Sequence, residues 1–472
     1  MVWRSRKRPR GKHLQAIVST LALLLMVSAP VRAVVVAGAP PDHDRQVEAL
    51  QARVAALEAQ NREILEVLKA LRAAPPAPHG AGGAQGAAGG IAGAAATPAT
   101  RQDVMPRQVL AGHDSSIGFY GFIRFDAIFD DSRSDAIQTP TFIRSETPGT
   151  SNQDAFNFHP RLTRFGFNYQ GPRLGGDRGA KLGGKIEVDF QNGGRESRQV
   201  MRMRHAFMTL DWEQTRLLVG QTWDIISPLY PTVNNDTMMW NAGNLGDRRP
   251  QVRGRIARAL ASGDKLTFEA GIGLSGAIDR QDLDSNGVRD GDDGLLQNLQ
   301  ARLAYARGGS DQRWTIGLSG HFGREQTQVP IAGENRFDSS SLSLDFAGRW
   351  GRFGLKGEAW IGSNLDDFRG GIGQGVNVMT GREIDAAGGW LEAGLEVTQV
   401  HSIYLGFTTD DPSDADLPAG GRSKNEVWYL VQRFRLARSF LVGIDYLNWR
   451  TEFQGLPAGE DNRFNLYLVY NF

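Results

Sequence analysis

Apolar and polar residues alternate with a period of two from Ile117 to the end of the chain. On the first such stretch Ile123 and Phe125 share one parity, and Arg124 and Asp126 share the other. The same alternation returns at 186–190, 266–274, 314–319, 342–349, 391–397 and 464–472. Strands of about ten residues with charges on the hidden face are typical of transmembrane β-barrels, whose interior is wet. A soluble sandwich would not bury so many carboxylates and arginines together.

Short turns alternate with long polar connections along this region. The turns are expected at 212–215, 261–265, 308–311, 351–352, 400–402 and 436–438. Short connections on one side and long ones on the other are the asymmetry of outer-membrane barrels. We predict an all-β transmembrane barrel of about sixteen antiparallel strands, wide enough to leave an aqueous channel. The predicted strands are 117–129, 160–170, 181–191, 198–212, 215–223, 251–261, 265–278, 296–307, 312–323, 338–350, 353–363, 389–399, 402–409, 423–435, 439–451 and 462–472.

Residues 46–72 repeat every seven positions instead. The core positions of these heptads are Val47, Leu50, Val54, Leu57, Asn61, Ile64, Leu68 and Leu71. A single helix of this kind is marginal alone, so we predict an α-helical coiled coil with partner helices. The buried amide of Asn61 is a device that fixes register and strand number. The alternative is a helix packed on the periplasmic end of the barrel, and the sequence does not fix the number of helices.

Two further segments flank the coiled coil. Residues 1–33 combine seven Lys and Arg, no acidic residue and an apolar stretch at 14–29, which is typical of a signal peptide. An uncleaved anchor is the alternative. Removing this segment changes the net charge from +1 to −6, so the basicity does not indicate a nucleic-acid partner. Residues 73–111 are rich in Ala, Gly and Pro and predict a flexible linker.

The connection 224–250 differs from the other long connections. It is less charged and carries four large side chains, Tyr230, Met238, Met239 and Trp240. Such residues prefer cover to open water. We therefore predict that this loop folds inward and constricts the pore. Packing of the loop on a neighbouring protomer is the alternative.

Arginines cluster around this loop. Those expected to line the channel are Arg198, Arg202, Arg204, Arg248, Arg249, Arg253 and Arg255. A guanidinium stays charged and offers a planar fork that matches carboxylates, so in a constriction it favours anions. Lumen carboxylates are expected to face these arginines across the pore and to pair some of them, namely Glu187, Asp189, Glu392 and Glu396. The alternative is a structural ladder of salt bridges in the wall.

The connection 279–295 is acidic at calcium-loop spacing. Its oxygen ligands would be Asp282, Asp284, Asn286, Asp290 and Asp293. Oxygens at alternate positions around a glycine turn suit Ca²⁺. Helices of the EF-hand type are lacking, and an Asp stands where a bidentate Glu is usual. The alternative is a solvated acidic loop, and no other cofactor is expected.

Enzyme chemistry finds little support in the sequence. The chain has no Cys, which excludes disulfide frameworks, Cys-based zinc sites and thiol nucleophiles. Histidines lack metal-ligand spacing, and no known nucleophile motif is present. We predict that the chain is not an enzyme.

Four segments resemble the DcaP-like porins of Gram-negative bacteria. They are RLTRFGFNY at 161–169, KIEVDF at 185–190, MRMRHAFM at 201–208 and LLVGQTWDIISP at 217–228. The resemblance covers most of 47–472 and implies homotrimers in the outer membrane, a periplasmic coiled coil and uptake of small anionic, often dicarboxylic, solutes. It makes the pairs Arg202/Arg204 and Arg253/Arg255 the expected lining. The final aromatic strand, ending at Phe472, is similar to the signal read by the barrel assembly machinery.

Two functions remain open at this stage. The first is an anion-preferring diffusion channel. The second is a structural or adhesive protein whose stalk tethers the outer membrane to the cell wall. Charges on the inner face of about sixteen strands favour the first, because a pure anchor needs fewer strands. A plugged lumen would favour the second.

Overall fold

The structure is a computed structural model that describes most of the chain after residue 106. The described residues are 107–111 (backbone only), 115–148, 153–176, 178–193, 198–261, 263–276, 282–290, 297–308 and 312–472. The predicted signal peptide, the coiled coil and most of the linker lie outside them. The last five residues of the predicted linker instead form strand β1, which pairs with the start of β2. Within the described residues, no helix has the length and apolar composition needed to cross a membrane.

The regular secondary structure of the described residues consists of strands and two 3₁₀ turns. The elements in order are β1 (Arg107–Ala111), β2 (Ser116–Asp130), β3 (Ala155–His159), β4 (Arg164–Leu174), β5 (Ala180–Asp189), β6 (Arg202–Asp211), β7 (Thr215–Trp223), β8 (Arg248–Ala259), β9 (Lys265–Gly273), β10 (Asn298–Gly308), β11 (Gln312–Ile331), β12 (Glu334–Trp350), β13 (Phe353–Ser363), the 3₁₀ turns η1 (Asp366–Phe368) and η2 (Gly371–Gly373), β14 (Val376–Asn377), β15 (Arg382–Glu383), β16 (Asp385–Glu396), β17 (His401–Pro412), β18 (Arg422–Ala437), β19 (Phe440–Phe453) and β20 (Leu456–Asn471).

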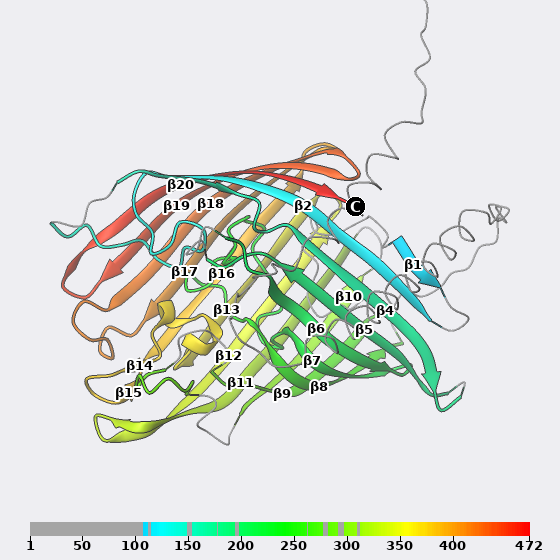
Figure 1. Cartoon of the computed structure of the whole chain (residues 1–472), viewed down its shortest axis with the longest axis horizontal. Coiled ribbons are helices and arrows are strands. Elements are labelled where there is room, and N and C mark those ends of the chain that lie inside the picture. The colour runs from blue at the N-terminus through cyan, green and yellow to red at the C-terminus, as the bar shows by residue number, and fades with distance from the viewer. Residues whose placement is uncertain are drawn as a thin grey trace, which may run out of the picture. The chain divides into compact units, whose positions relative to one another are not determined.

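The sheet closes on itself. Successive wall strands pair antiparallel, β13 pairs with β16 past the separate hairpin β14–β15, and β20 returns to pair with β2. In Figure 1 the cyan β2 and the red β20 run side by side. Both β3 and β4 pair with β2, so they are one strand interrupted at Pro160, which has no N–H to donate. Counted in this way the barrel has sixteen strands, as the sequence predicts.

The two faces of the wall carry different residues. Outward-facing apolar side chains stay exposed on the isolated chain, for example Phe125, Phe268, Leu344 and Phe464. Side chains of the opposite parity are charged or polar and buried, for example Asp126, Glu269, Asp345 and Asn465. An apolar outer face with a polar inner face suits a barrel surrounded by lipid.

This polarity predicts a large cost for a charge on the outer face. Leu344 lies in the middle of β12 between Leu318 and Ala359, and 47% of it is exposed. The substitution Leu344→Arg should lower the free energy of unfolding in lipid vesicles by about 2–4 kcal/mol, since Arg is costly near the bilayer midplane. Urea titration measures this, and Leu344→Ala is the control for lost packing. An equal loss in both variants would argue against lipid at this position.

The connections differ at the two ends of the barrel. We call the end where β2 starts and β20 finishes the near end, and the opposite end the far end. Connections at the near end are short, as predicted, for example Gly351-Arg352 between β12 and β13. Two far-end connections expected to be long are instead two-residue turns, Ala332-Gly333 and Gln454-Gly455. Gly333 and Gly455 have positive φ angles of 96° and 72°, which glycine adopts without steric strain because it has no Cβ atom. The strands on either side of these turns extend beyond their predicted ends.

Three far-end loops turn into the barrel, and we name them by their described residues as loop 131–148, loop 224–247 and loop 364–384. Apolar side chains of the first two join β17–β19 in one buried cluster, made of Ile143, Val233, Met239, Ala242, Tyr404, Val427, Tyr429, Val431, Leu447 and Trp449. Leu245 and Leu365, from the second and third loops, pack with Trp360 and Ala386 of the wall. The interior is therefore packed on the β16–β19 side.

Candidate functional site

A basic patch lies on the inner wall across β4, β5 and β6. Four cationic side chains surround two buried carboxylates, those of Glu187 and Asp189. Arg204 binds both of them, with Nε 2.9 Å from Glu187 Oε1 and Nη1 2.9 Å from Asp189 Oδ2. Arg202 Nη2 lies 2.8 Å from Asp189, whereas Lys185 and Arg164 lie 3.2 and 3.5 Å from Glu187. Arg202 also lies 3.7 Å from Asp236 of loop 224–247, so the four cationic side chains of the patch face three carboxylates.

A β-bulge builds this patch. The register between β5 and β6 shifts after Glu187, so that Val188 pairs with Met203 and Glu187 pairs with His205. Arg204 is the extra residue, and both it and His205 are buried on the inner side. A bulge re-aims side chains in this way without ending the strand.

The arginines of β8 have different fates. Arg249 is completely buried, with Nε 2.6 Å from Asp224 and Nη1 2.6 Å from Asp367. Arg255 lies 3.7 Å from Glu269. Arg253 makes no ion pair with any described residue, and its Nη1 is 3.5 Å from the carbonyl oxygen of Trp223.

Two of the arginines predicted to line the channel do not line it. Arg249 is wrong as a lining residue, because both its charge and its donors are used to join loop 224–247 to loop 364–384. Arg198 is exposed in the connection before β6, which begins four residues later than the predicted strand. Arg202, Arg204, Arg253 and Arg255 lie on the inner wall as expected.

Arg248 stands over an aromatic group where loop 224–247 meets the wall. Its guanidinium carbon is 4.6 Å from the ring centre of Trp223, and its Nη1 is buried without a hydrogen-bond partner. The ring of Trp223 is 4.9 Å from that of Tyr230 and 6.0 Å from that of Trp240. Trp240 and Met239 are buried, whereas Tyr230 and Met238 keep part of their surface.

Wall carboxylates hold loop 224–247 along its length. Glu358 of β13 accepts a hydrogen bond from the backbone N–H of Leu229 at 2.7 Å and another from the hydroxyl of Ser227. Glu392 of β16 accepts one from the N–H of Thr232 at 2.6 Å. Further along the loop, Asp445 of β19 and Asp126 of β2 accept hydrogen bonds from the backbone and the side chain of Asn234. The loop therefore crosses the interior from β8 to the wall opposite.

The carboxylates expected to face the arginines across the pore lie elsewhere. Glu187 and Asp189 do not face the arginines across the pore, but lie within the basic patch and pair with Arg202 and Arg204, as the second part of the prediction states. Glu392 is buried and occupied by Thr232, Lys356 and Tyr429. Glu396 lies at the near end of β16, 3.0 Å from Arg349, with 40% of its side chain exposed.

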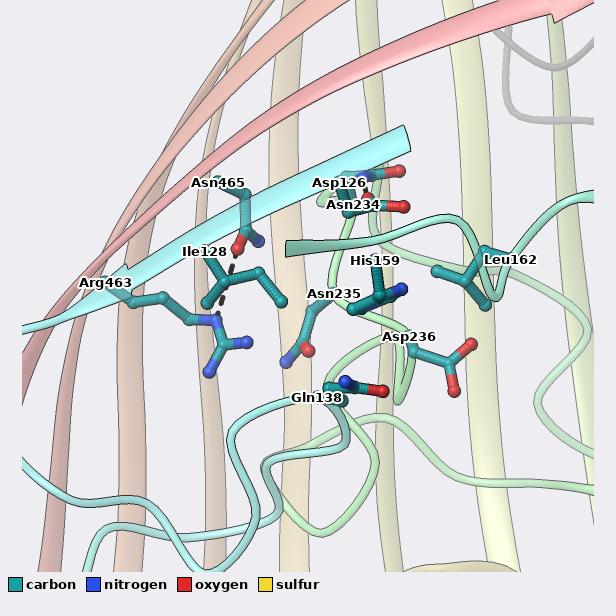
Figure 2. A pocket seen from close by; sticks show the side chains of 10 residues that line it. All are labelled: Asp126, Ile128, Gln138, His159, Leu162, Asn234, Asn235, Asp236, Arg463 and Asn465. Carbon is teal, nitrogen blue, oxygen red and sulfur yellow. Dashed lines mark hydrogen bonds between the residues drawn. The ribbon is translucent and has the colours of Figure 1, made fainter. Parts of the chain in front are cut away.

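A polar pocket lies between loop 131–148, loop 224–247 and the wall (Figure 2). Its volume is about 200 Å³, including the solvent at its mouth, and its lining includes Asp126, His159, Asp236 and Arg463. The side-chain amide of Asn235 is buried there with neither its oxygen nor its nitrogen hydrogen-bonded. The pocket has the polar groups that hold ordered water.

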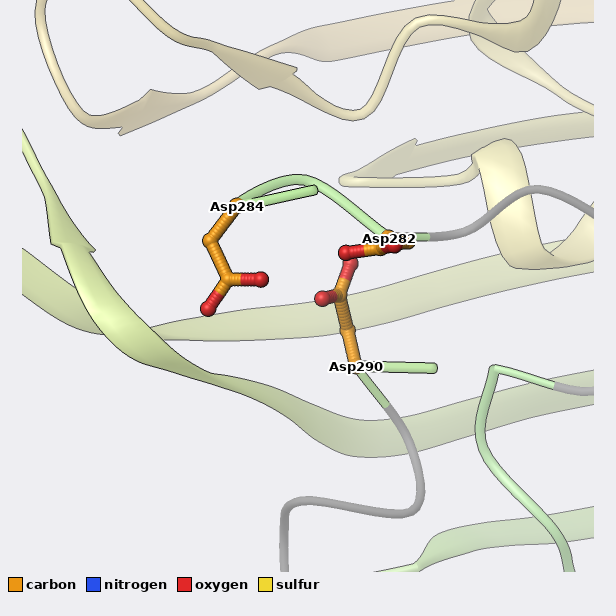
Figure 3. Close-up of side chains that lie close together, drawn as sticks. All are labelled: Asp282, Asp284 and Asp290. Carbon is orange, nitrogen blue, oxygen red and sulfur yellow. The ribbon is translucent and has the colours of Figure 1, made fainter. Parts of the chain in front are cut away.

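The acidic far-end loop keeps part of its predicted arrangement. One carboxylate oxygen each of Asp282, Asp284 and Asp290 lies within 4.8 Å of the others (Figure 3). Asn286 donates from its backbone to Asp282 at 3.0 Å and from its side chain to Asp284 at 3.1 Å. Asp293 lies outside the described residues. A bound Ca²⁺ at this loop stays a prediction.

Sequence reasoning missed three contributors to the inner wall. The inward orientation of Lys185 and Arg164 could have been predicted from the alternation along their strands, since each shares its face with a lumen residue of the same strand. Glu358 gave no such signal as a loop-binding group, because its partners Ser227 and Leu229 are more than a hundred residues away in the chain.

Comparison with known proteins identifies the fold. No protein-family model and no curated protein matches the chain. The outer membrane channel DcaP of Acinetobacter baumannii is similar in structure, with a TM-score of 0.61, 17% sequence identity and coverage of 77% of this chain and 99% of that one. The anion-selective porin from Comamonas acidovorans gives a TM-score of 0.48 at 14% identity, over 76% of this chain and 100% of that one. The expected resemblance to DcaP-like porins is thus confirmed for the fold.

Proposed function

We propose that the chain is an outer-membrane porin through which small hydrophilic solutes diffuse passively, with a preference for anions such as carboxylates and dicarboxylates. The observation that carries this proposal is the local excess of positive charge in the basic patch on β4, β5 and β6. Around Glu187 and Asp189 stand four cationic side chains, and Arg253 has no carboxylate partner among the described residues. An uncompensated guanidinium in a confined aqueous path attracts anions and repels cations.

Exposure of the basic patch supports a water-filled path beside it. The side chains of Arg164, Lys185 and Arg202 keep 22, 24 and 31% of their surface exposed. The apolar cluster of the loops lies against β17–β19, on a different part of the wall. In this proposal loop 224–247 is the constriction. Solutes pass between this loop and the inner face of strands β4–β8, which carries the basic patch and Arg253.

The assembly follows from the same proposal. We infer that the barrel lies in the outer membrane, which its apolar outer face of sixteen strands supports, with the near end toward the periplasm, where short turns are usual. The predicted coiled coil would then extend into the periplasm and hold three copies together. DcaP is itself an outer membrane channel, which supports this placement. Outer-membrane lipid and the barrel assembly machinery are the remaining expected partners.

Neutralising the two arginines should weaken the anion preference. The double variant Arg202→Gln/Arg253→Gln removes two positive charges from the inner wall, one on β6 and one on β8. Arg204 still pairs with both carboxylates of the basic patch. Planar-bilayer reversal potentials under a KCl gradient should show the chloride-to-potassium permeability ratio falling several-fold.

The matched control is Arg450→Gln, which removes the same charge from an exposed arginine paired with Glu452 and Glu460. Arg450 has the parity of the outer face of β19, so the ratio should stay unchanged. Equal ratios for the control and the double variant would place the filter elsewhere. A protein that forms no conducting channel would favour the structural role instead.

A further inference from the structure

One carboxylate near the far end of β11 is buried without a counter-charge. Glu325 is 2% exposed, and its Oε2 accepts a hydrogen bond from Asn364 Nδ2 at 3.1 Å. Its Oε1 is buried and has no hydrogen-bond partner. No ion pair joins Glu325 to any cationic side chain in the described part of the chain. A buried carboxylate in this state is costly unless a cation or a proton is bound to it.

A second orphaned oxygen faces the same region from loop 364–384. Asn364 is fully buried, and its Oδ1 also has no hydrogen-bond partner. A methyl group built on Gly375 would meet Asn364 Oδ1 at 2.1 Å and Asp366 Oδ1 at 2.3 Å. These two oxygens therefore lie together beside Gly375, where Asp366 Oδ1 also accepts a hydrogen bond from the N–H of Asp367 at 2.9 Å.

The surroundings are acidic. The carboxylates of Asp366, Asp367 and Asp290 lie close enough to Glu325 to interact with it electrostatically. Arg249 lies on the other side of Asp367, where it is already bound to Asp224 as well. Burial also raises the pKa of Asp290, in the loop of Figure 3, to about 7. The carboxyl group of Glu325 therefore lies in acidic surroundings, and no described cationic side chain forms an ion pair with Glu325 itself.

We propose that Glu325, Asn364 and Asp366 bind a divalent cation, with Ca²⁺ as the ion that fits best. Carboxylate and amide oxygens are the ligands that Ca²⁺ prefers, and it tolerates the irregular geometry that three separate side chains provide. Mg²⁺ fits less well, because it demands a near-ideal octahedron. This site differs from the acidic loop 282–290 and does not depend on which solutes pass through the barrel.

The bound ion would fasten loop 364–384 to the wall. Asn364 has a left-handed φ of 53°, which an asparagine adopts more readily than most residues. Its backbone N–H donates to Ile384 at 3.0 Å, at the other end of the same loop. An ion on the side chain would thus hold both the start of the loop and Glu325 of β11 in place.

Calcium binding by the full chain in detergent tests the proposal. Titration of CaCl₂ in a calorimeter, into protein freed of divalent ions with EGTA, should detect a site that Glu325→Gln and Gly375→Ala each weaken roughly tenfold or more. The first variant removes a charged ligand without changing its shape, and the second fills the space between two ligand oxygens. Thermal unfolding followed in parallel should show Ca²⁺ raising the Tm of the unmodified protein, with little rise in either variant.

The control is Asp284→Asn, which alters the neighbouring acidic loop and should leave this site intact. Calcium binding that is lost in Asp284→Asn but kept in Glu325→Gln would overturn the proposal and place the ion at residues 282–290. Absence of binding in the unmodified protein would also overturn it, and Glu325 would then carry a proton. If Glu325→Gln fails to fold, the comparison of Gly375→Ala with Asp284→Asn decides.

Discussion

Replacing Arg249 by methionine should strongly destabilise the barrel. The substitution Arg249→Met leaves Asp224 and Asp367 buried at the junction of two loops without their shared counter-ion. It also removes donors to the carbonyl oxygens of Asp367 and Leu274. Breaking a buried ion pair from one side costs about 3–5 kcal/mol, so the free energy of unfolding in vesicles should fall by that amount.

The cost should come from the stranded charges rather than from lost packing. The triple variant Arg249→Met/Asp224→Asn/Asp367→Asn keeps the shapes and removes all three charges, so it should recover most of the loss. Urea titration compares the two variants. A single variant as stable as the unmodified protein would show that Arg249 does not join the loops in the way described.

Glu392 and Glu396 should respond very differently to the same substitution. Glu392→Ala removes the acceptor for Thr232 and Tyr429 and leaves the buried Lys356 uncompensated. A loss of about 3–5 kcal/mol in the free energy of unfolding is expected. Because loop 224–247 loses one of its fastenings, single-channel conductance should also rise and become noisier.

Glu396→Ala is the matched control, since it alters the same residue type on the same face of β16. Its partner Arg349 is half-exposed at the near end, so the loss should be at most about 1 kcal/mol. Conductance should stay unchanged. Equal effects of the two substitutions would mean that Glu392 does not hold the loop.

The strands could be predicted from the sequence because their pattern is set by the surroundings of the wall. An apolar outer face and a wet interior force a period of two, whatever the distant partners are. The predicted bounds of β7 and β13, 215–223 and 353–363, agree with the observed ones. The interruption before β4 was missed, since Phe156 and Phe158 alternate with polar residues for only five positions.

The fate of each charged side chain could not be predicted from parity alone. Arg249, Arg253 and Arg255 share one face of β8, yet Arg249 is bound between two aspartates, whereas Arg253 has no ion-pair partner among the described residues. That difference depends on Asp367, which lies more than a hundred residues further along the chain. Pairing of Glu187 and Asp189 with arginines is expected from the sequence, but the bulge in β6 that puts them beside Arg204, on the same side of the pore, is not.

The central claim is that the inner wall makes this barrel an anion-preferring channel. Its most direct test is the reversal potential of the unmodified full chain in a planar bilayer separating two KCl concentrations. The reversal potential should have the sign of the chloride equilibrium potential. It should move toward zero as both KCl concentrations are raised at a constant ratio, because salt screens the charges of the arginines. A potential on the potassium side, or one at zero at every concentration, would contradict the claim.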